Sequence, residues 1–84
     1  MLRALMLSSM LLLGLTVPTL AEDATTLDGQ FVNVRSGPGM KYSRVCVAWP
    51  GVRFTVSDCG RNWCSANYLG KDGWISVHHI EIQR

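Results

Sequence analysis

The sequence predicts a small all-β domain, and two observations lead to that prediction. Short segments in which apolar and polar residues alternate follow one another between turns rich in Gly, Pro and Asn, as half-buried strands do. Beyond the N-terminal segment, no stretch repeats apolar residues at helical spacing for long enough to form a helix. Five short strands with closely spaced turns favour a small barrel or sandwich. Such a barrel is filled by its own side chains, so we expect no cofactor and a partner that binds outside.

Residues 1–21 have the features of a cleavable signal peptide. Arg3 supplies the positive charge, Leu5–Val17 is a short apolar run, and Ala21 is a small residue suited to cleavage before Glu22. The apolar run is shorter than the about 20 residues that a membrane-spanning helix needs. We therefore expect an exported protein, periplasmic or extracellular, that does not contact the membrane after cleavage. The alternative is an uncleaved N-terminal anchor.

The rest of the chain divides into a flexible leader, residues 22–30, and one domain, residues 31–84. The leader is polar and contains the turn-forming pair Asp28-Gly29. The expected strands cover residues 31–34, 44–49, 52–58, 63–68 and 74–77, with turns at 50–51, 60–62 and 69–73. A single 3₁₀ turn and a short strand are expected within residues 78–82.

Alternation along these strands selects the side chains that face the core. The expected inward set is Val32, Val34, Val45, Val47, Phe54, Val56, Trp63, Ala66, Trp74, Ile75 and Ile80. The other aromatic side chains, which include Tyr42, Trp49 and Tyr68, would then either cover the ends of the barrel or form a shallow groove on its surface.

The charge balance argues against a nucleic-acid partner. The chain has eight basic and six acidic residues, and seven basic residues remain once Arg3 is removed with the signal peptide. A partner held mainly through its phosphates would need a larger excess of positive charge.

Three cysteines allow one intramolecular disulfide and leave one thiol. Cys59 and Cys64 flank a tight turn, and a hairpin would bring them close enough for a bridge. A bridge from Cys46 to either of them would instead join non-adjacent strands. The remaining thiol, if it is Cys46, is either a small buried apolar side chain or a group that could link two chains.

We expect neither a catalytic residue nor a metal site. Cys64 with His78 or His79 has the composition of a nucleophile and a base, but a bridged cysteine is a poor nucleophile and no second lobe exists to form a cleft. The set Cys46, Cys64, His78 and His79 does not suit a metal ion, because adjacent histidines on a strand point to opposite faces.

Five motifs resemble, in the same order, those of bacterial SH3 domains of the SH3b type. The segment Val32–Gly39 (VNVRSGPG) resembles the opening LNVRSGPG of that family. The other motifs are Tyr42 and Val45 in place of Y-P-V, the turn Pro50-Gly51, Cys59 with Trp63-Cys64 in the form GC…WC, and Gly73–Ser76 (GWIS) in the form GWVS before a closing pair, here His79-Ile80. The resemblance covers about residues 31–80 and implies an SH3-like, five-stranded, partly open barrel.

The resemblance also implies roles for individual residues. It favours Cys59–Cys64 as the disulfide, and it places Val34, Trp63 and Trp74 in the core. The sequence departs from the family at three places. Pro50 and Gly51 are adjacent, where the family has a residue between them. His79 replaces a closing aromatic residue, and Trp49 replaces a smaller aliphatic residue.

The motif after the first strand predicts a rigid turn into a long loop. Gly37 and Gly39 allow unusual backbone angles, Pro38 fixes its own φ, and the Asn33 side chain can hydrogen-bond to nearby backbone. Arg35 then has two interpretations. It either pairs with a local carboxylate such as Asp58 or Asp72, or it flanks a groove and binds a carboxylate of a ligand.

The function implied by the resemblance is non-catalytic binding in the cell envelope, because relatives of this type are usually modules of peptidoglycan hydrolases or sensors. We expect a peptidoglycan peptide or glycan as the ligand, and the alternative is a role as an interaction subunit or inhibitor of another envelope protein. We expect a monomer, with a dimer linked through Cys46 as the other arrangement. The candidate ligand-binding residues are Arg35, Ser36, Tyr42, Trp49, Asn62, Tyr68 and His79.

Overall fold

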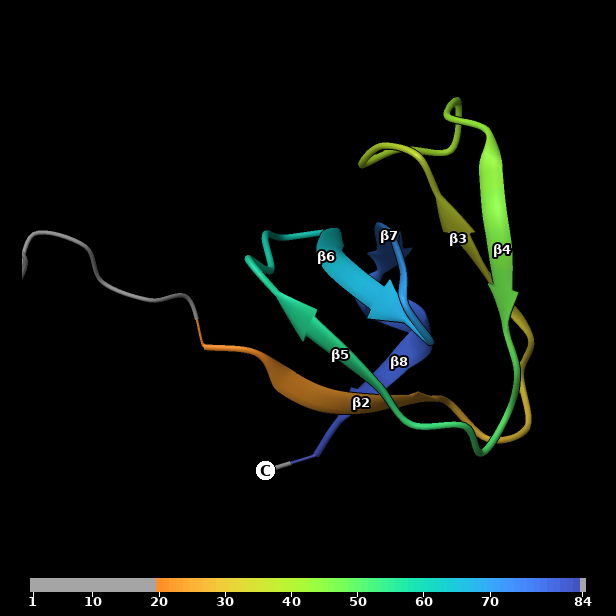
Figure 1. The fold of residues 1–84 in the computed structure, drawn as a ribbon, viewed down its shortest axis with the longest axis vertical. Coiled ribbons are helices and arrows are strands. Elements are labelled where there is room, and N and C mark those ends of the chain that lie inside the picture. The colour runs from red at the N-terminus through yellow and green to blue at the C-terminus, as the bar shows by residue number, and fades with distance from the viewer. Residues whose placement is uncertain (1–19, 84) are drawn as a thin grey trace, which may run out of the picture.

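Seven antiparallel strands form one curled sheet in residues 20–83, which are the residues that the computed structural model describes (Figure 1). The strands are β2 (Glu22–Thr26), β3 (Val32–Arg35), β4 (Arg44–Ala48), β5 (Phe54–Ser57), β6 (Trp63–Tyr68), β7 (Lys71–Ser76) and β8 (Ile80–Ile82). Their order in the sheet is β4-β3-β7-β6-β5-β2-β8, so β4 and β8 lie at its two edges and the barrel stays open. The 3₁₀ turn η1 (Val77–His79) precedes β8, as predicted. The all-β, SH3-like prediction is confirmed: β3 to β7 correspond to the five expected strands, β8 corresponds to the short strand expected within residues 78–82, and β2 is additional.

The predicted signal peptide lies outside the described residues except for Leu20 and Ala21, both exposed. Within residues 20–83, no helix has the length and apolar character needed to cross a membrane.

The predicted flexible leader is wrong for residues 22–26, which form β2 inside the sheet. This strand pairs with β5 through Ala24↔Phe54 and with β8 through Ala24↔Ile82. Ala24 is fully buried, and Thr26 is buried with its Oγ1 donating to the carbonyl oxygen of Gln30 at 2.7 Å. The segment looks like a leader in the sequence because its inward residues are small or polar and carry little apolar signal.

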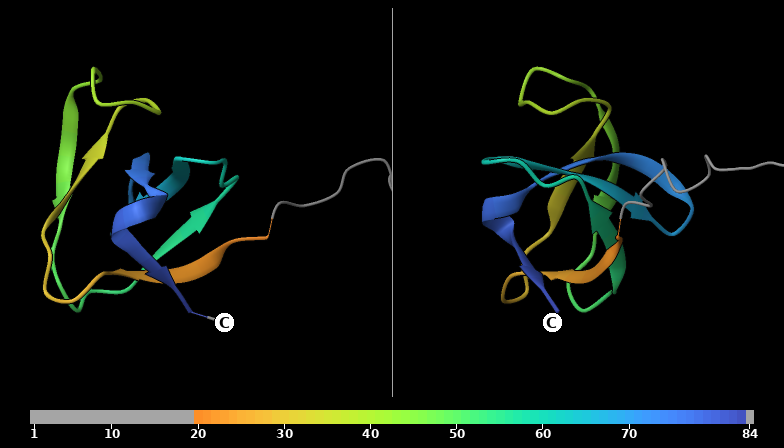
Figure 2. Two further views of the ribbon diagram at one scale, coloured as in Figure 1. Left: turned by 180° about the vertical axis from the view of Figure 1, so that it is seen from behind. Right: turned by 90° about the vertical axis from the view of Figure 1, so that its left-hand side faces the viewer.

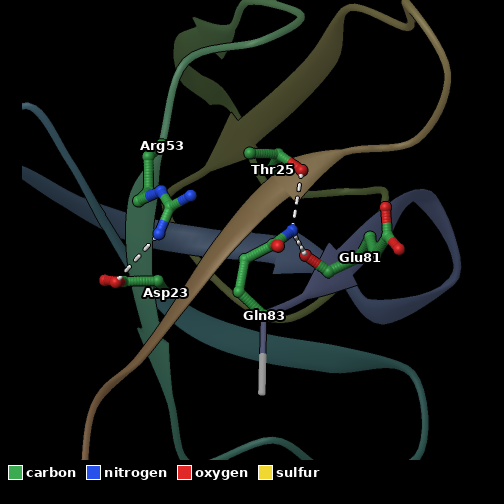
Figure 3. Close-up of polar contacts among 5 residues, drawn as sticks. All are labelled: Asp23, Thr25, Arg53, Glu81 and Gln83. Atoms are coloured by element: carbon green, nitrogen blue, oxygen red, sulfur yellow. Dashed lines mark hydrogen bonds and ion pairs between the residues drawn. The ribbon is translucent and has the colours of Figure 1, made fainter.

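Side chains at the surface also fasten β2 to its neighbours (Figure 3). Gln83 Nε2 donates to Thr25 Oγ1 at 3.2 Å and to the carbonyl oxygen of Glu81 at 3.4 Å. Arg53 Nη1 lies 3.5 Å from Asp23 Oδ2, but both side chains are at least half exposed. Exposed ion pairs contribute only about 0–1 kcal/mol, so β2 is held mainly by its backbone pairing and by the burial of Ala24.

The turn between β6 and β7 is shorter than the predicted turn at residues 69–73. Tyr68 pairs directly with Lys71, so the connection contains only Leu69 and Gly70. These two residues have φ of 53° and 90°, as expected for a two-residue hairpin turn of type I′. The strand β7 therefore begins at Lys71, three residues before the predicted start at Trp74.

The core lies on the concave face of the sheet. Its buried apolar residues are Ala24, Val32, Val34, Ala48, Phe54, Val56, Cys64, Ala66, Tyr68, Ile75 and Ile80. Residues that pair across strands share a face, and the pairs Val56↔Ala66 and Cys64↔Ile75 fix which face of β5, β6 and β7 is inward.

The predicted core positions of Trp63 and Trp74 are therefore wrong. Each tryptophan is one residue out of phase with the inward set, so both lie half-buried on the outer face. Val45 and Val47 are also misplaced by the prediction, because Val32 pairs with Ala48 and Val34 pairs with Cys46. This register turns Ala48 and Cys46 inward, leaving Val47 half-buried and Val45 41% exposed.

Candidate functional site

An open groove of about 560 Å³ lies on the outer side of the sheet. It is bounded by the connection from β2 to β3, by β3 and the loop after it, and by the adjoining parts of β6, β7 and η1. The lining residues are Gln30, Phe31, Val32, Asn33, Arg35, Met40, Trp63, Ser76 and His79. Figure 2 shows that the β3–β4 hairpin extends beyond the other strands and that its loop bends toward β6 and β7.

The strand period explains why these residues meet. In β3, Val32 and Val34 are buried, so Asn33 and Arg35 occupy the alternate positions on the outer side. Trp63 on β6 pairs with Ser76 on β7, and both lie on the same outer face. The groove thus places a guanidinium group and an indole ring, from strands separated by β7, along one surface.

The loop after β3 is closed by Tyr42, which packs against Gly37. A Cβ atom on Gly37 would lie 2.5 Å from Tyr42 Cδ1, and one on Gly39 would lie 3.4 Å from Tyr42 Cδ2. Neither glycine has a positive φ. The predicted role of these glycines in unusual backbone angles is therefore wrong. Gly37 is needed for the close approach of the ring, whereas a side chain at position 39 would make only an ordinary contact with it.

Ser36 closes the base of the same loop rather than lining the groove. Its backbone N–H donates to the carbonyl oxygen of Ser43 at 2.8 Å, and the two side-chain oxygens lie 3.4 Å apart. Ser36 and Tyr42, both predicted to bind ligand, thus act on the shape of the loop.

Arg35 stabilises the loop and also borders the groove. Its Nη1 donates to the carbonyl oxygen of Tyr42 at 2.9 Å, which uses one of five N–H donors. In the described residues it forms no ion pair with Asp58 or Asp72, so that interpretation is wrong. The carboxylate of Asp72 instead accepts from Asn67 Nδ2 at 2.8 Å.

Phe31 and Trp49 form an exposed aromatic pair at the end of the groove. Their ring centroids are 5.4 Å apart in an edge-to-face arrangement, and the two side chains are 61% and 60% exposed. Phe31 lines the groove, whereas Trp49 does not. Trp49 is therefore next to the candidate site but not within it.

Tyr68 is a core residue, and its predicted role in ligand binding is wrong. The side chain is 6% exposed and its ring packs edge-to-face against Phe54 with centroids 5.7 Å apart. Its hydroxyl accepts a hydrogen bond from the backbone N–H of Trp49 at 3.0 Å. This bond anchors the segment that carries Trp49 to the core.

The turn between β5 and β6 is bridged by Cys59–Cys64, so the predicted disulfide is present. Asn62 in this turn contacts η1 twice, because its Oδ1 lies 2.9 Å from His78 Nε2 and its carbonyl oxygen accepts from Val77 N–H at 2.9 Å. Asn62 therefore positions η1, and His79 of η1 is the residue that reaches the groove.

Cys46 carries a free thiol and packs, partly buried, against the core. Across residues 20–83, no group of three or more His, Cys, Asp or Glu side chains is arranged to hold a metal ion.

The groove brings together only part of the predicted site. Arg35 and His79, both predicted to bind ligand, line it, together with Asn33, expected to hold the turn, and Trp63, expected in the core. The prediction missed Gln30, Phe31, Met40 and Ser76. A signal for Phe31 exists in the sequence, since residues 31, 33 and 35 alternate with the buried valines and share one face of the strand.

Comparison with known proteins agrees with this architecture. No curated protein sequence matches the chain. The family model of the bacterial SH3 domain matches residues 28–81, which is well over half of the chain and includes β3 to β7 in full and most of β8, but not β2. The chain therefore belongs to the bacterial SH3 domain family.

Proposed function

We propose that this protein is a non-catalytic binding module of the cell envelope that holds a peptide or glycan segment of peptidoglycan in the groove. The bacterial SH3 fold supports a binding role in general terms. The expected export of the chain would bring the groove into contact with the cell wall. The proposal depends on one observation, which is that Arg35 opens onto the same groove as Phe31 and Trp63.

The lining suits such a ligand chemically. Phe31 and Trp63 offer apolar ring surface for a sugar ring or an alkyl side chain, and Asn33 and Gln30 offer amide donors and acceptors. The lining contains no Asp or Glu, so the Arg35 guanidinium is the dominant charge. A planar guanidinium group binds carboxylates with two parallel hydrogen bonds.

Retention on purified peptidoglycan sacculi tests the proposal. We expect the wild-type protein to be retained, and we expect Arg35→Ala and Phe31→Ala each to weaken retention. The matched controls are Arg53→Ala and Leu69→Ala, which remove an exposed arginine and an exposed apolar side chain outside the groove. Equal loss in the controls, or no retention of the wild-type protein, would contradict a peptidoglycan ligand in this groove.

The exposed Phe31–Trp49 pair favours a second candidate function, in which the domain binds another envelope protein. Aromatic side chains are enriched at the centres of protein interfaces. The same sacculus experiment separates the two functions when it is repeated with soluble envelope extract. Retention only in the presence of extract, lost on Trp49→Ala, supports the interaction subunit.

A further inference from the structure

The β3–β4 hairpin concentrates positive charge without any carboxylate. Residues 29–57 contain Arg35, Lys41, Arg44 and Arg53 but no Asp or Glu. Three of these four cations lie on the hairpin. Lys41 Nζ lies 5.6 Å from the centroid of the Tyr42 ring, and the backbone carbonyl oxygen of Tyr42 accepts a hydrogen bond from Arg35. The acidic residues of the chain lie on other strands and turns.

A β-bulge places two of these cations directly opposite each other. The pairing runs Val34↔Cys46 and then Arg35↔Arg44, with Val45 left as the extra residue of β4. Without the bulge, Arg35 would face Val45. Bulges often re-aim a side chain, and this one sets Arg44 on the same outer face as Arg35, which lines the groove.

The arrangement is unfavourable for the free protein. Like charges directly opposite each other destabilise an antiparallel pair, and the nearest acidic side chain on the next strand, Asp72, is already bonded to Asn67. Facing Cα atoms in an antiparallel pair are about 4.5–5.5 Å apart, so both guanidinium groups can reach a single anionic group. An anionic ligand at this position would remove the repulsion.

We propose that Arg35 and Arg44 form an anion site at the hairpin end of the groove, and that it binds the free carboxylate of a peptide ligand. This inference rests on the proposed function and names the chemical group that the groove selects. A peptide fits better than a phosphate polymer, because the groove lining, which includes Arg35 but not Arg44, offers two aromatic rings and two amides but no second arginine or lysine. Lys41 adds long-range attraction from the loop.

Binding of short peptidoglycan stem peptides to the purified protein tests the site by calorimetry. We expect the free-acid peptide to bind at least about tenfold more tightly than the same peptide with amidated carboxyl groups, because charge-assisted hydrogen bonds are lost. Equal affinity for the two forms would overturn the inference while leaving the proposed function intact. No binding of either form would overturn the inference and the peptide form of the proposed function, while retention on sacculi would still test a glycan ligand. Inorganic phosphate that competes as well as the free-acid peptide would show a general anion site and would overturn the carboxylate assignment.

Two variants, Arg44→Ala and Arg61→Ala, test the role of the cross-strand pair through both stability and affinity for the peptide. Arg44→Ala removes the repulsion, so we expect its urea midpoint at low salt to rise while its affinity for the free-acid peptide falls by about tenfold. Arg61 lies in the exposed turn after Cys59 and serves as the matched control, with neither change expected. A lower urea midpoint together with unchanged affinity in Arg44→Ala would overturn the anion site.

Discussion

A glycine is needed at position 37 because any larger side chain would clash with the Tyr42 ring, and not because of its backbone angle. Because the Tyr42 ring lies where a Cβ atom would stand, at 2.5 Å, the glycine fixes the position of the whole loop. The sequence motif showed that a glycine was needed here, but the reason depends on a contact five residues further along the chain. Such a contact cannot be read from local propensities.

We expect Gly37→Ala to lower the free energy of unfolding by about 1–3 kcal/mol, as overpacking of a close contact does. Urea denaturation measures the change. Gly60→Ala is the control, since its nearest non-neighbouring atom would lie at an ordinary 3.8 Å from the new Cβ. In a Tyr42→Ala background the cost of Gly37→Ala should largely disappear, and an undiminished cost would contradict the ring contact as the cause.

Tyr68 and Tyr42 were both predicted to bind ligand, but Tyr68 lies in the core and Tyr42 packs against Gly37. Tyr68→Phe removes the acceptor of the Trp49 N–H, so we expect a loss of about 0.5–1.5 kcal/mol in the free energy of unfolding. Retention on sacculi should not change, because the side chain is buried and lies outside the groove. Tyr42→Phe is the matched control with no loss expected, and a selective loss of binding in Tyr68→Phe would contradict the core assignment.

Strand β2 is the element that sequence patterns could not find. The predicted β6 agrees with the structure at both ends, since residues 63–68 alternate clearly, and the other predicted strands agree within a few residues. In contrast, β2 offers Ala24 and Thr26 as its inward residues, and neither marks a strand as strongly as a branched or aromatic apolar residue would. Its place between β5 and β8 is set by pairing with segments about 30 and 60 residues away.

A charge in the middle of β2 tests whether the strand belongs to the folded domain. Ala24→Asp would place an unpaired carboxylate at a fully buried position, so we expect a loss of about 3–5 kcal/mol in the free energy of unfolding. Asp23→Ala, at the exposed neighbouring position, should cost less than about 1 kcal/mol through the lost contact with Arg53. Equal, small effects of the two substitutions would restore the interpretation of residues 22–30 as a leader.

The Cys59–Cys64 disulfide closes the β5–β6 turn, directly before Trp63 in the strand β6. The bridge closes a loop of six residues, for which the chain-entropy relation gives about 2 kcal/mol of stabilisation. Cys59→Ser removes the bridge at its exposed end and leaves the buried Cys64 in the core, so we expect a loss near that size in urea denaturation. Cys46→Ser is the control for removal of a thiol, and unchanged stability of Cys59→Ser would show that the turn holds without the bridge.

At the scale of the whole molecule, the sequence predicted the fold better than the site. Turns and strand alternation are local, and they indicate most of the strands, although not β2, and the class of fold that the strands build. The groove instead depends on which face of each strand becomes convex. One residue of phase moved Trp63 and Trp74 from the expected core to the outer surface, and one bulged residue, Val45, brought Arg44 opposite Arg35. These shifts follow from pairing across the sheet, and no pattern in the nearby sequence indicates them.

The expected cleavage site after Ala21 coincides with the start of β2 at Glu22. Cleavage after Ala21 would leave Glu22 as the first residue, and Glu22 is also the first residue of this strand, so the mature chain would keep every strand of the sheet. We expect mass spectrometry of the protein from the periplasm or the medium to show a chain that begins at Glu22. Ala21→Arg should block processing, because signal cleavage needs a small residue there, while leaving the described strands unchanged. Unprocessed wild-type protein in the membrane fraction would instead support the uncleaved anchor.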